Sequence, residues 1–272
     1  MRVIIMTDLE GVAGVINAGD WIYPTSRYYE DARALLTAEV NAAVDGFACA
    51  GAEKIVVEDG HGHGAINCAL LDERAEMQRG WGRHPYPFGV DDGFDVMAWV
   101  GQHPNAGTLY GHLCHTGNFG VVDVSINGVS VGEFGECAFC ALEYGVTPIF
   151  GSGDLAFTKE AEALFPGIGT VAIKRGVMDV AGAELNAEQY ELHNSGAIHL
   201  SPIRARKLIR DGAYAALIRY REHPETFSRE FPQPPYTAVW KLRQHGETPP
   251  QTLYKRHSTS VTGLLNAPFE KT

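Results

Sequence analysis

The feature that most constrains the fold is a regular alternation of short apolar runs with longer segments of helical spacing. Apolar runs at 2–7, 54–58 and 94–100 have the length of buried strands. Residues 26–50 carry apolar side chains at helical intervals, and we also predict a helix over 66–79. This rhythm is typical of α/β proteins, and it predicts a largely parallel sheet covered by helices in three layers.

The pattern continues after residue 120. Asn127-Gly128 separates apolar runs at 121–126 and 129–131, and this dipeptide between apolar runs is a strong hairpin signal. We expect a helix over about 132–145 and another strand at 147–150.

The second half of the chain is less regular. We expect GSGD at 151–154 to form a tight turn into the next helix, and a strand at 171–174. A long helix is predicted over 201–222, and Pro-rich residues 231–236 form a rigid turn before a strand at 237–242.

These patterns suggest a division of the chain. We assign residues 1–155 to an α/β core and residues 156–272 to a smaller α+β portion that completes the fold and contributes to subunit contacts. A boundary near residue 230 and a single domain are the alternatives.

Composition excludes several classes of protein. The net charge of -11 argues against a nucleic-acid partner. We find no signal peptide and no run of about 18 apolar residues, so we expect a cytoplasmic protein without a membrane partner. The five cysteines are irregularly spaced, and Cys137 and Cys140 are interpreted as small apolar side chains one helical turn apart.

Acidic and histidine side chains follow three consecutive predicted strands. Asp8 and Glu10 follow the first, His61 and His63 the second, and His103 the third. Because ligands bind beyond the carboxyl ends of parallel strands, these side chains should meet at one edge. Oxygen and imidazole ligands together suit zinc, manganese or iron, although a turn former, a helix cap or solvated loop histidines would explain each residue separately.

Two further stretches add candidates. His112 and His115 lie in a glycine-bounded loop after the third strand, and Glu133 begins a predicted helix. The helix dipole alone would stabilise a carboxylate there, but Glu133 could also be a ligand. We place Glu136, one turn later, on the surface.

Two carboxylates side by side repel unless a cation lies between them, and one carboxylate can bridge two metals.

The order and spacing of six motifs resemble those of a known family. They are TDLEG at 7–11, EDGHG at 58–62, GQH at 101–103, LCHTG at 113–117, INGVSVGEFG at 126–135 and TPIFGSGD at 147–154. The chain resembles the zinc-dependent D-aminopeptidases of the bacterial dipeptide-transport type, the DppA family. The resemblance covers roughly residues 1–155 well and the remainder loosely.

The resemblance implies two zinc ions per chain, with Asp8 as the bridging ligand and Glu10, His61, His103 and Glu133 as the other ligands. It implies that His115 is the nucleophile or catalytic base. It also implies a homo-oligomer, typically a decamer, that hydrolyses short peptides with an N-terminal D-residue. His63 competes with His61 as a ligand, and the motif alignment favours His61.

Two other functions fit the residue pattern. A dinuclear phosphoesterase or amidohydrolase would also place aspartate, glutamate and histidine at strand ends. A non-catalytic peptide-binding protein is the alternative from outside the enzymes.

Overall fold

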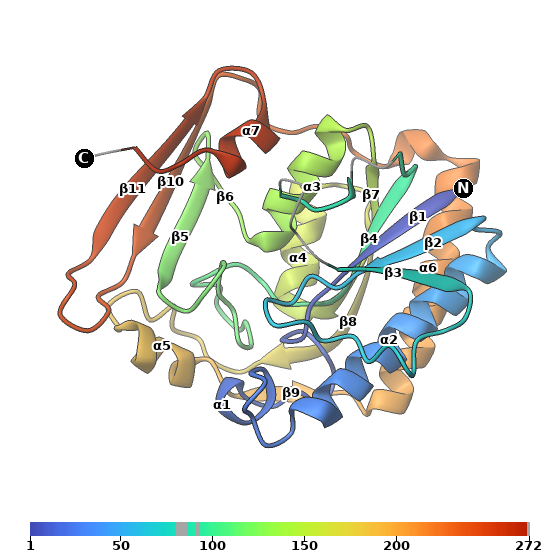
Figure 1. Ribbon diagram of the computed structural model, residues 1–272, viewed down its shortest axis with the longest axis horizontal. Coiled ribbons are helices and arrows are strands. Elements are labelled where there is room, and N and C mark those ends of the chain that lie inside the picture. Colours follow the sequence, from blue (N-terminus) through green and yellow to red (C-terminus); the bar gives the residue numbers. More distant parts are fainter. Residues whose placement is uncertain (80–85, 91–92, 271–272) are drawn as a thin grey trace.

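The fold is described from a computed structural model, for residues 1–79, 86–90 and 93–270. Its larger sheet has the strand order β3-β2-β1-β4-β7-β8-β9. Its strands are β1 (Arg2–Thr7), β2 (Lys54–Glu58), β3 (Ala75–Gln78), β4 (Val96–Gln102), β7 (Thr147–Asp154), β8 (Gly169–Gly176) and β9 (Ala197–His199). All neighbours pair in parallel except β8 and β9. The predicted α/β fold with a largely parallel sheet is confirmed (Figure 1).

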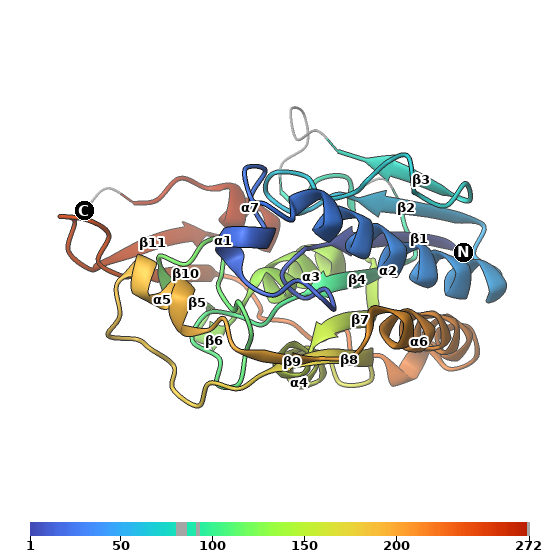
Figure 2. The same ribbon diagram turned by 90° about the horizontal axis from the view of Figure 1, so that it is seen from below.

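Helices cover both faces of this sheet. The side-chain alternation of β1 sends Val3 and Ile5 to one apolar cluster and Ile4 and Met6 to another. The first cluster contains α2 (Tyr29–Cys49) and α6 (Pro202–Glu222), which lie side by side in Figures 1 and 2. The second cluster contains α3 (Glu133–Glu143) and α4 (Leu155–Leu164). The three predicted layers are therefore present.

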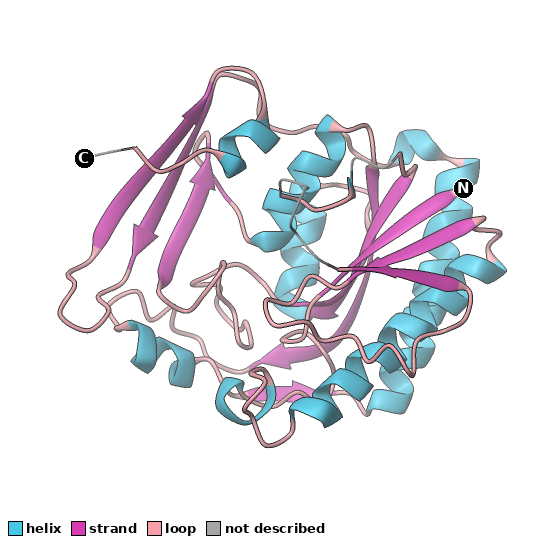
Figure 3. Cartoon of the chain, viewed as in Figure 1, coloured by secondary structure: helices cyan, strands magenta, loops and turns pink. Residues whose placement is uncertain are grey.

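A second, antiparallel sheet has the order β11-β10-β5-β6 and lies apart from the first (Figure 3). Its strands are β5 (Val121–Ile126), β6 (Val129–Ser130), β10 (Tyr236–Leu242) and β11 (Gln251–His257). Asn127 and Gly128 both have positive φ, 49° and 83°, between β5 and β6. The predicted Asn-Gly hairpin is confirmed, because this turn type needs positive φ at both positions. The remaining helices are α1 (Ala18–Trp21), α5 (Ala187–His193), the 3-10 turn η2 (Pro224–Thr226) and α7 (Val261–Asn266).

Both sheets contain strands from both halves of the chain. β8 pairs with β7, and β10 pairs with β5. The division at residue 155 stays a prediction, and the two portions share a continuous pairing network. No helix within the described ranges is long and apolar enough to cross a membrane.

The predicted helix over 66–79 is wrong. The segment consists of turns followed by β3, which pairs in parallel with β2. Side chains of Asn67 and Asp72 accept hydrogen bonds from the backbone N–H groups of Ala69 and Arg74, at 3.1 and 3.0 Å. Such local bonds compete with helix formation, which explains the failure of the prediction.

The predicted tight turn at 151–154 is also wrong, because GSGD forms the last half of β7. Here the glycines permit close packing. A Cβ on Gly153 would lie 1.9 Å from the carbonyl oxygen of Gln102 on the neighbouring strand. Asp154 then caps α4 by accepting a hydrogen bond from the N–H of Ala156 at 2.6 Å.

Candidate metal centre

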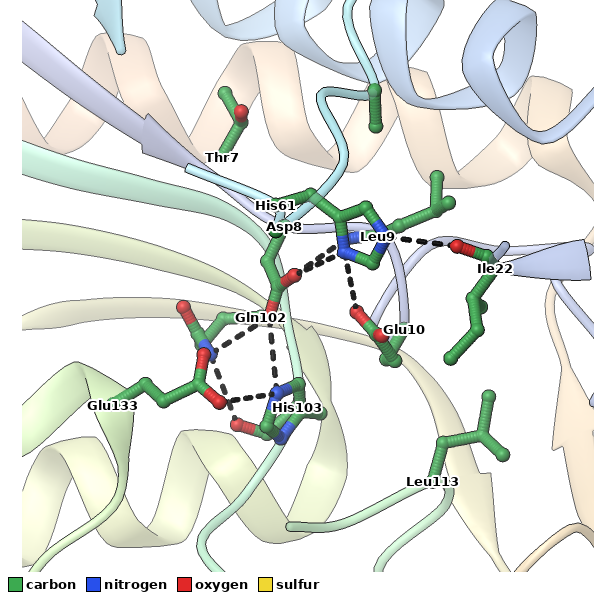
Figure 4. A network of polar contacts seen from close by, with 12 residues as sticks. Thr7, Asp8, Leu9, Glu10, Ile22, His61, Gln102, His103, Leu113 and Glu133 are labelled. Carbon is green, nitrogen blue, oxygen red and sulfur yellow. Dashed lines mark hydrogen bonds and ion pairs between the residues drawn. The ribbon is translucent and has the colours of Figure 1, made fainter. Parts of the chain in front are cut away.

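The candidate centre lies where the order of the parallel strands reverses. The chain runs from β1 outward through β2 to β3, and then returns to place β4 on the other side of β1. Connections leave such neighbouring strands in opposite directions and open a crevice at their carboxyl ends. Asp8 follows β1, His61 follows β2 and His103 follows β4 directly, so all three reach this crevice (Figure 4).

Glycines allow the loop after β1 to lie against the end of β4. The N–H of Gly11 donates to the carbonyl of Gly101 at 2.7 Å, and Gly101 has a φ of 80°. A Cβ on Gly11 would lie 2.2 Å from the carbonyl oxygen of Gln102. The glycines of TDLEG and GQH therefore bring two candidate ligand segments together.

Asp8 lies between two imidazoles. Its Oδ1 is 3.2 Å from Nδ1 of His61, and its Oδ2 is 3.0 Å from Nε2 of His103. The two oxygens of one carboxylate thus face two different side chains, as Figure 4 shows.

Two further carboxylates, those of Glu10 and Glu133, lie beside the imidazoles of the centre. Glu10 Oε2 is 3.3 Å from Nδ1 of His61. Glu133 Oε1 is 3.6 Å from Nε2 of both His103 and His115. Asp8, Glu10 and His103 can bring ligand atoms within 4.8 Å of one another, and so can His103, His115 and Glu133.

The far nitrogen of each histidine fixes its tautomer. His61 Nε2 contacts the carbonyl oxygen of Ile22, His103 Nδ1 that of Pro104, and His115 Nδ1 that of Leu113, each at 2.9 Å. A carbonyl only accepts, so each of these nitrogens carries a hydrogen. The other nitrogen of each ring then faces carboxylates, which also only accept. This arrangement requires a proton or a metal ion between them.

The pKa shifts of the site residues describe the charge of the centre. Burial raises the pKa of a carboxyl group, but His103 and His61 outweigh burial and hold the pKa of Asp8 below its usual range. Burial is likewise outweighed at Glu133, where His103 lowers the pKa to about 2. The pKa values of His61 and His103 are raised despite burial, because carboxylates surround them. Glu10 Oε2 and His103 Nε2 are buried, and each lies within ion-pair distance of a side chain of the cage, at 3.3 Å from His61 Nδ1 and 3.0 Å from Asp8 Oδ2, without forming a well-aligned hydrogen bond among the described residues. The centre is therefore an anionic cage with donor atoms available to a cation.

A pocket of about 450 Å³ opens beside this cage. Asp8, Glu10, His61, His115 and Glu133 all contribute to its lining. Its other walls come mainly from aromatic and apolar side chains, and they include Tyr23, Tyr86, Phe88, Trp99, Phe119 and Cys137. Mostly apolar walls with a few convergent polar groups are typical of a small-molecule site.

A family model described as D-aminopeptidase matches residues 1–248. The chain belongs to this D-aminopeptidase family. A curated D-aminopeptidase of Bacillus subtilis (strain 168) is 30% identical over 182 residues, which are 65% of this chain and 65% of that protein. The chain thus aligns with less than two thirds of the length of that relative.

The fold of this D-aminopeptidase family member has also been seen in a solved structure. The structure is described as Zn-dependent D-aminopeptidase DppA from Bacillus subtilis, a self-compartmentalizing protease. The TM-score is 0.82 at 22% sequence identity, and the match covers 97% of this chain and 94% of the other. At this identity, the likeness establishes the fold.

The other two candidate histidines, His63 and His112, lie in different surroundings. His63 is exposed at the pocket rim, with its ring centroid 6.3 Å from that of His61. His112 is fully buried, and its Nε2 donates to the carbonyl of Ile16 at 2.9 Å. Burial, with Lys174 nearby, lowers the pKa of His112 to about 2. His112 is therefore a neutral structural residue outside the cage.

Sequence reasoning missed three contributors to the site of this D-aminopeptidase family member. Gln102 Nε2 donates to Asp8 Oδ2 at 3.2 Å, although GQH was noted only for His103. The Lys174 ammonium donates to the carbonyl oxygen of Glu10, and no local motif marks that contact. Glu136 lines the pocket and is half-buried, so its predicted surface position is wrong. It lies on α3 one turn after Glu133, and this face of the helix points into the pocket instead of solvent.

Proposed function

We propose that this chain is a binuclear zinc aminopeptidase that hydrolyses short peptides with an N-terminal D-residue. The observation that carries the proposal is the carboxylate of Asp8 between two histidines whose inward nitrogens face only acceptors. The family assignment supports the reaction class, and the zinc dependence named for the solved relative supports the metal.

The residues present fit two zinc ions. We assign Glu10 and His61 to one ion, His103 and Glu133 to the other, and Asp8 to a bridge between them. Imidazole nitrogens and carboxylate oxygens are ordinary zinc ligands. The buried Glu10 Oε2 and His103 Nε2, which form no well-aligned hydrogen bond in the described part of the chain, would each coordinate a zinc ion. Zinc bound here would act as a Lewis acid and lower the pKa of a coordinated water.

We assign proton transfer to His115. Its Nδ1–H donates to the carbonyl of Leu113, so Nε2 is the nitrogen that can accept a proton or attack. Stacking on His103, with ring centroids 4.0 Å apart, and contact with Phe119 restrict the ring. His115 also lines the pocket, so a substrate there meets the imidazole directly.

Three further assignments belong to the proposal. We infer a homo-oligomer, typically a decamer, because the solved relative is described as self-compartmentalizing. Sedimentation velocity would test this state. We also place the protein in the cytoplasm, which cell fractionation would test, and we assign subunit contacts to residues 156–272.

The deciding experiment pairs metal analysis with a substrate panel. We expect about two zinc ions per chain and chelator-sensitive hydrolysis of D-Ala p-nitroanilide. A preference for L-Ala p-nitroanilide would overturn the stereochemistry alone. Cleavage of p-nitrophenyl phosphate in its place would favour a phosphoesterase. Tight dipeptide binding without turnover would favour a binding protein, and activity without bound metal would overturn the proposal.

A further inference from the structure

A second carboxyl group lies in the pocket beyond the proposed metal ligands. Glu136 follows Glu133 by three residues on α3, and residues at this spacing lie on the same side of a helix, about one turn apart. Both side chains line the pocket. Glu136 therefore lies next to the proposed metal centre, and the proposed reaction assigns it no role.

The Glu136 carboxyl group has no direct partner of opposite charge among the described residues, although the more distant Lys255 lowers its pKa. Its Oε1 is buried and has no hydrogen-bond partner among the described residues. No lysine, arginine or histidine of the described ranges forms an ion pair with it. Burial first and the neighbouring Glu133 second raise the pKa of Glu136 to about 8, and Lys255 only partly offsets them. Leaving such a group without a partner is unfavourable unless a ligand supplies one.

The walls around Glu136 define the kind of ligand that would fit. Met6, Tyr86, Phe88, Trp99 and Cys137 line the same pocket. Aromatic side chains attract organic cations through their ring faces, and a buried carboxylate supplies a charge-assisted hydrogen bond. Apolar walls beside an acid that is not a proposed metal ligand are suited to an ammonium group on a carbon chain.

We propose that Glu136 binds a primary ammonium group of the peptide substrate. This inference rests on the proposed aminopeptidase function. A peptide whose first carbonyl lies at the centre carries its α-ammonium only two bonds away, and a basic first side chain ends in the same group. Both sources have the same chemistry, so the experiment must distinguish them.

The test compares wild type with Glu136→Gln, which keeps the size and removes the charge, and with Glu136→Asp, which keeps the charge on a shorter arm. Glu73→Gln is the matched control, because Glu73 is exposed and lies outside the pocket lining. Substrates are the p-nitroanilides of alanine, norleucine and lysine in the handedness that wild type prefers. Thermal unfolding and zinc content verify that each variant is folded and loaded.

We expect Glu136→Gln to lower kcat/KM by at least about tenfold, mainly through KM, with Glu136→Asp in between. An equal loss for all three substrates assigns Glu136 to the α-ammonium. A loss confined to the lysine substrate assigns it to a basic side chain. Unchanged kcat/KM on all three substrates in a folded, zinc-loaded Glu136→Gln variant would overturn the inference.

A binding measurement separates this inference from the aminopeptidase proposal. n-Butylamine, protonated at neutral pH, should raise the melting temperature of wild type and of Glu73→Gln but not that of Glu136→Gln. n-Butanol should have no such selective effect. If wild type cleaves no p-nitroanilide yet shows this pattern, the enzyme proposal fails and the ammonium site stands. An equal response of wild type and Glu136→Gln to n-butylamine would contradict the site itself.

Discussion

Two polar clusters, buried except for the half-buried Glu133, lie on either side of the loop after β1, and their partners differ. The front cluster is the proposed ligand set of Asp8, Glu10, His61, His103 and Glu133. The rear cluster consists of Glu39, His112, Asp154 and Lys174, all buried. In the front cluster, side chains mainly face other side chains, whereas in the rear cluster they mainly bond to backbone groups.

The rear cluster holds the loop in place. Lys174 donates to the carbonyl of Glu10 and to that of Val12, the latter at 3.2 Å, while Glu39 accepts from the N–H of Ala13 at 3.0 Å. These groups satisfy the loop backbone from within the chain. The front cluster has the opposite character, because its donor atoms remain available to cations.

Two histidines of the connection between β4 and β5 show how surroundings decide a residue's role. His103 and His112 are both buried, yet carboxylates raise the pKa of His103 while burial lowers that of His112 to about 2. His103 and His112 share their residue type and their burial, so only the surrounding charges distinguish the candidate ligand from the structural residue.

The most severe test of the comparison is Asp8→Ala in the front cluster. We expect loss of both zinc ions and a fall in activity on the order of 10³-fold or more, because one carboxylate would serve both ions. Metal analysis by mass spectrometry and the p-nitroanilide assay measure this. Asp179→Ala, at an exposed position, is the control. Full zinc content in Asp8→Ala would exclude the bridging role.

His115→Ala should separate catalysis from metal binding. We expect zinc content to be retained and kcat to fall by about 10²-fold to 10³-fold, the range typical of a lost general base. His63→Ala, at the exposed rim, should keep both zinc and most of the activity. Near-normal turnover in His115→Ala would mean that another group moves the proton.

Lys174→Met probes the rear cluster. The substitution keeps a long side chain but leaves buried carbonyls of the loop unpaired, so the free energy of unfolding should fall by about 3 kcal/mol. Zinc affinity should weaken by about 10-fold to 100-fold, as expected when support of a ligand segment is lost. Urea unfolding of the chelated protein and zinc titration measure the two effects. Unchanged stability would show that Lys174 does not hold the loop.

The smallest expected effect is a pH dependence from His112. Its folded pKa of about 2 lies below its ordinary value of 6.5, so its contribution to stability is present above pH 6.5 and is lost as the pH falls toward 2. His112→Gln keeps a donor but cannot titrate. The stability of wild type relative to this variant should fall by about 1.4 kcal/mol per pH unit between pH 6 and 4. Parallel pH profiles in urea unfolding would contradict a neutral buried His112.

Periodicity predicted the elements of the main sheet that have strong apolar runs. The predicted ends of β1, β2 and β4 lie within two residues of the observed ends. The prediction succeeded because a buried parallel strand needs a short apolar run. Segment 66–79 was mispredicted because the side chains of Asn67 and Asp72 form turns that compete with a helix. Strand β11 was not predicted, since its exposed residues carry no apolar pattern.

The sequence by itself determined which chemical groups follow each strand, because strand ends and glycine turns are local properties. Asp8, His61 and His103 were therefore predicted to share one edge, and the structure places them together. Only the tertiary structure decided that His112 turns to backbone carbonyls, that Lys174 supports the loop and that Glu136 faces the pocket. These outcomes depend on contacts between residues far apart in sequence, and such contacts leave no periodic signal.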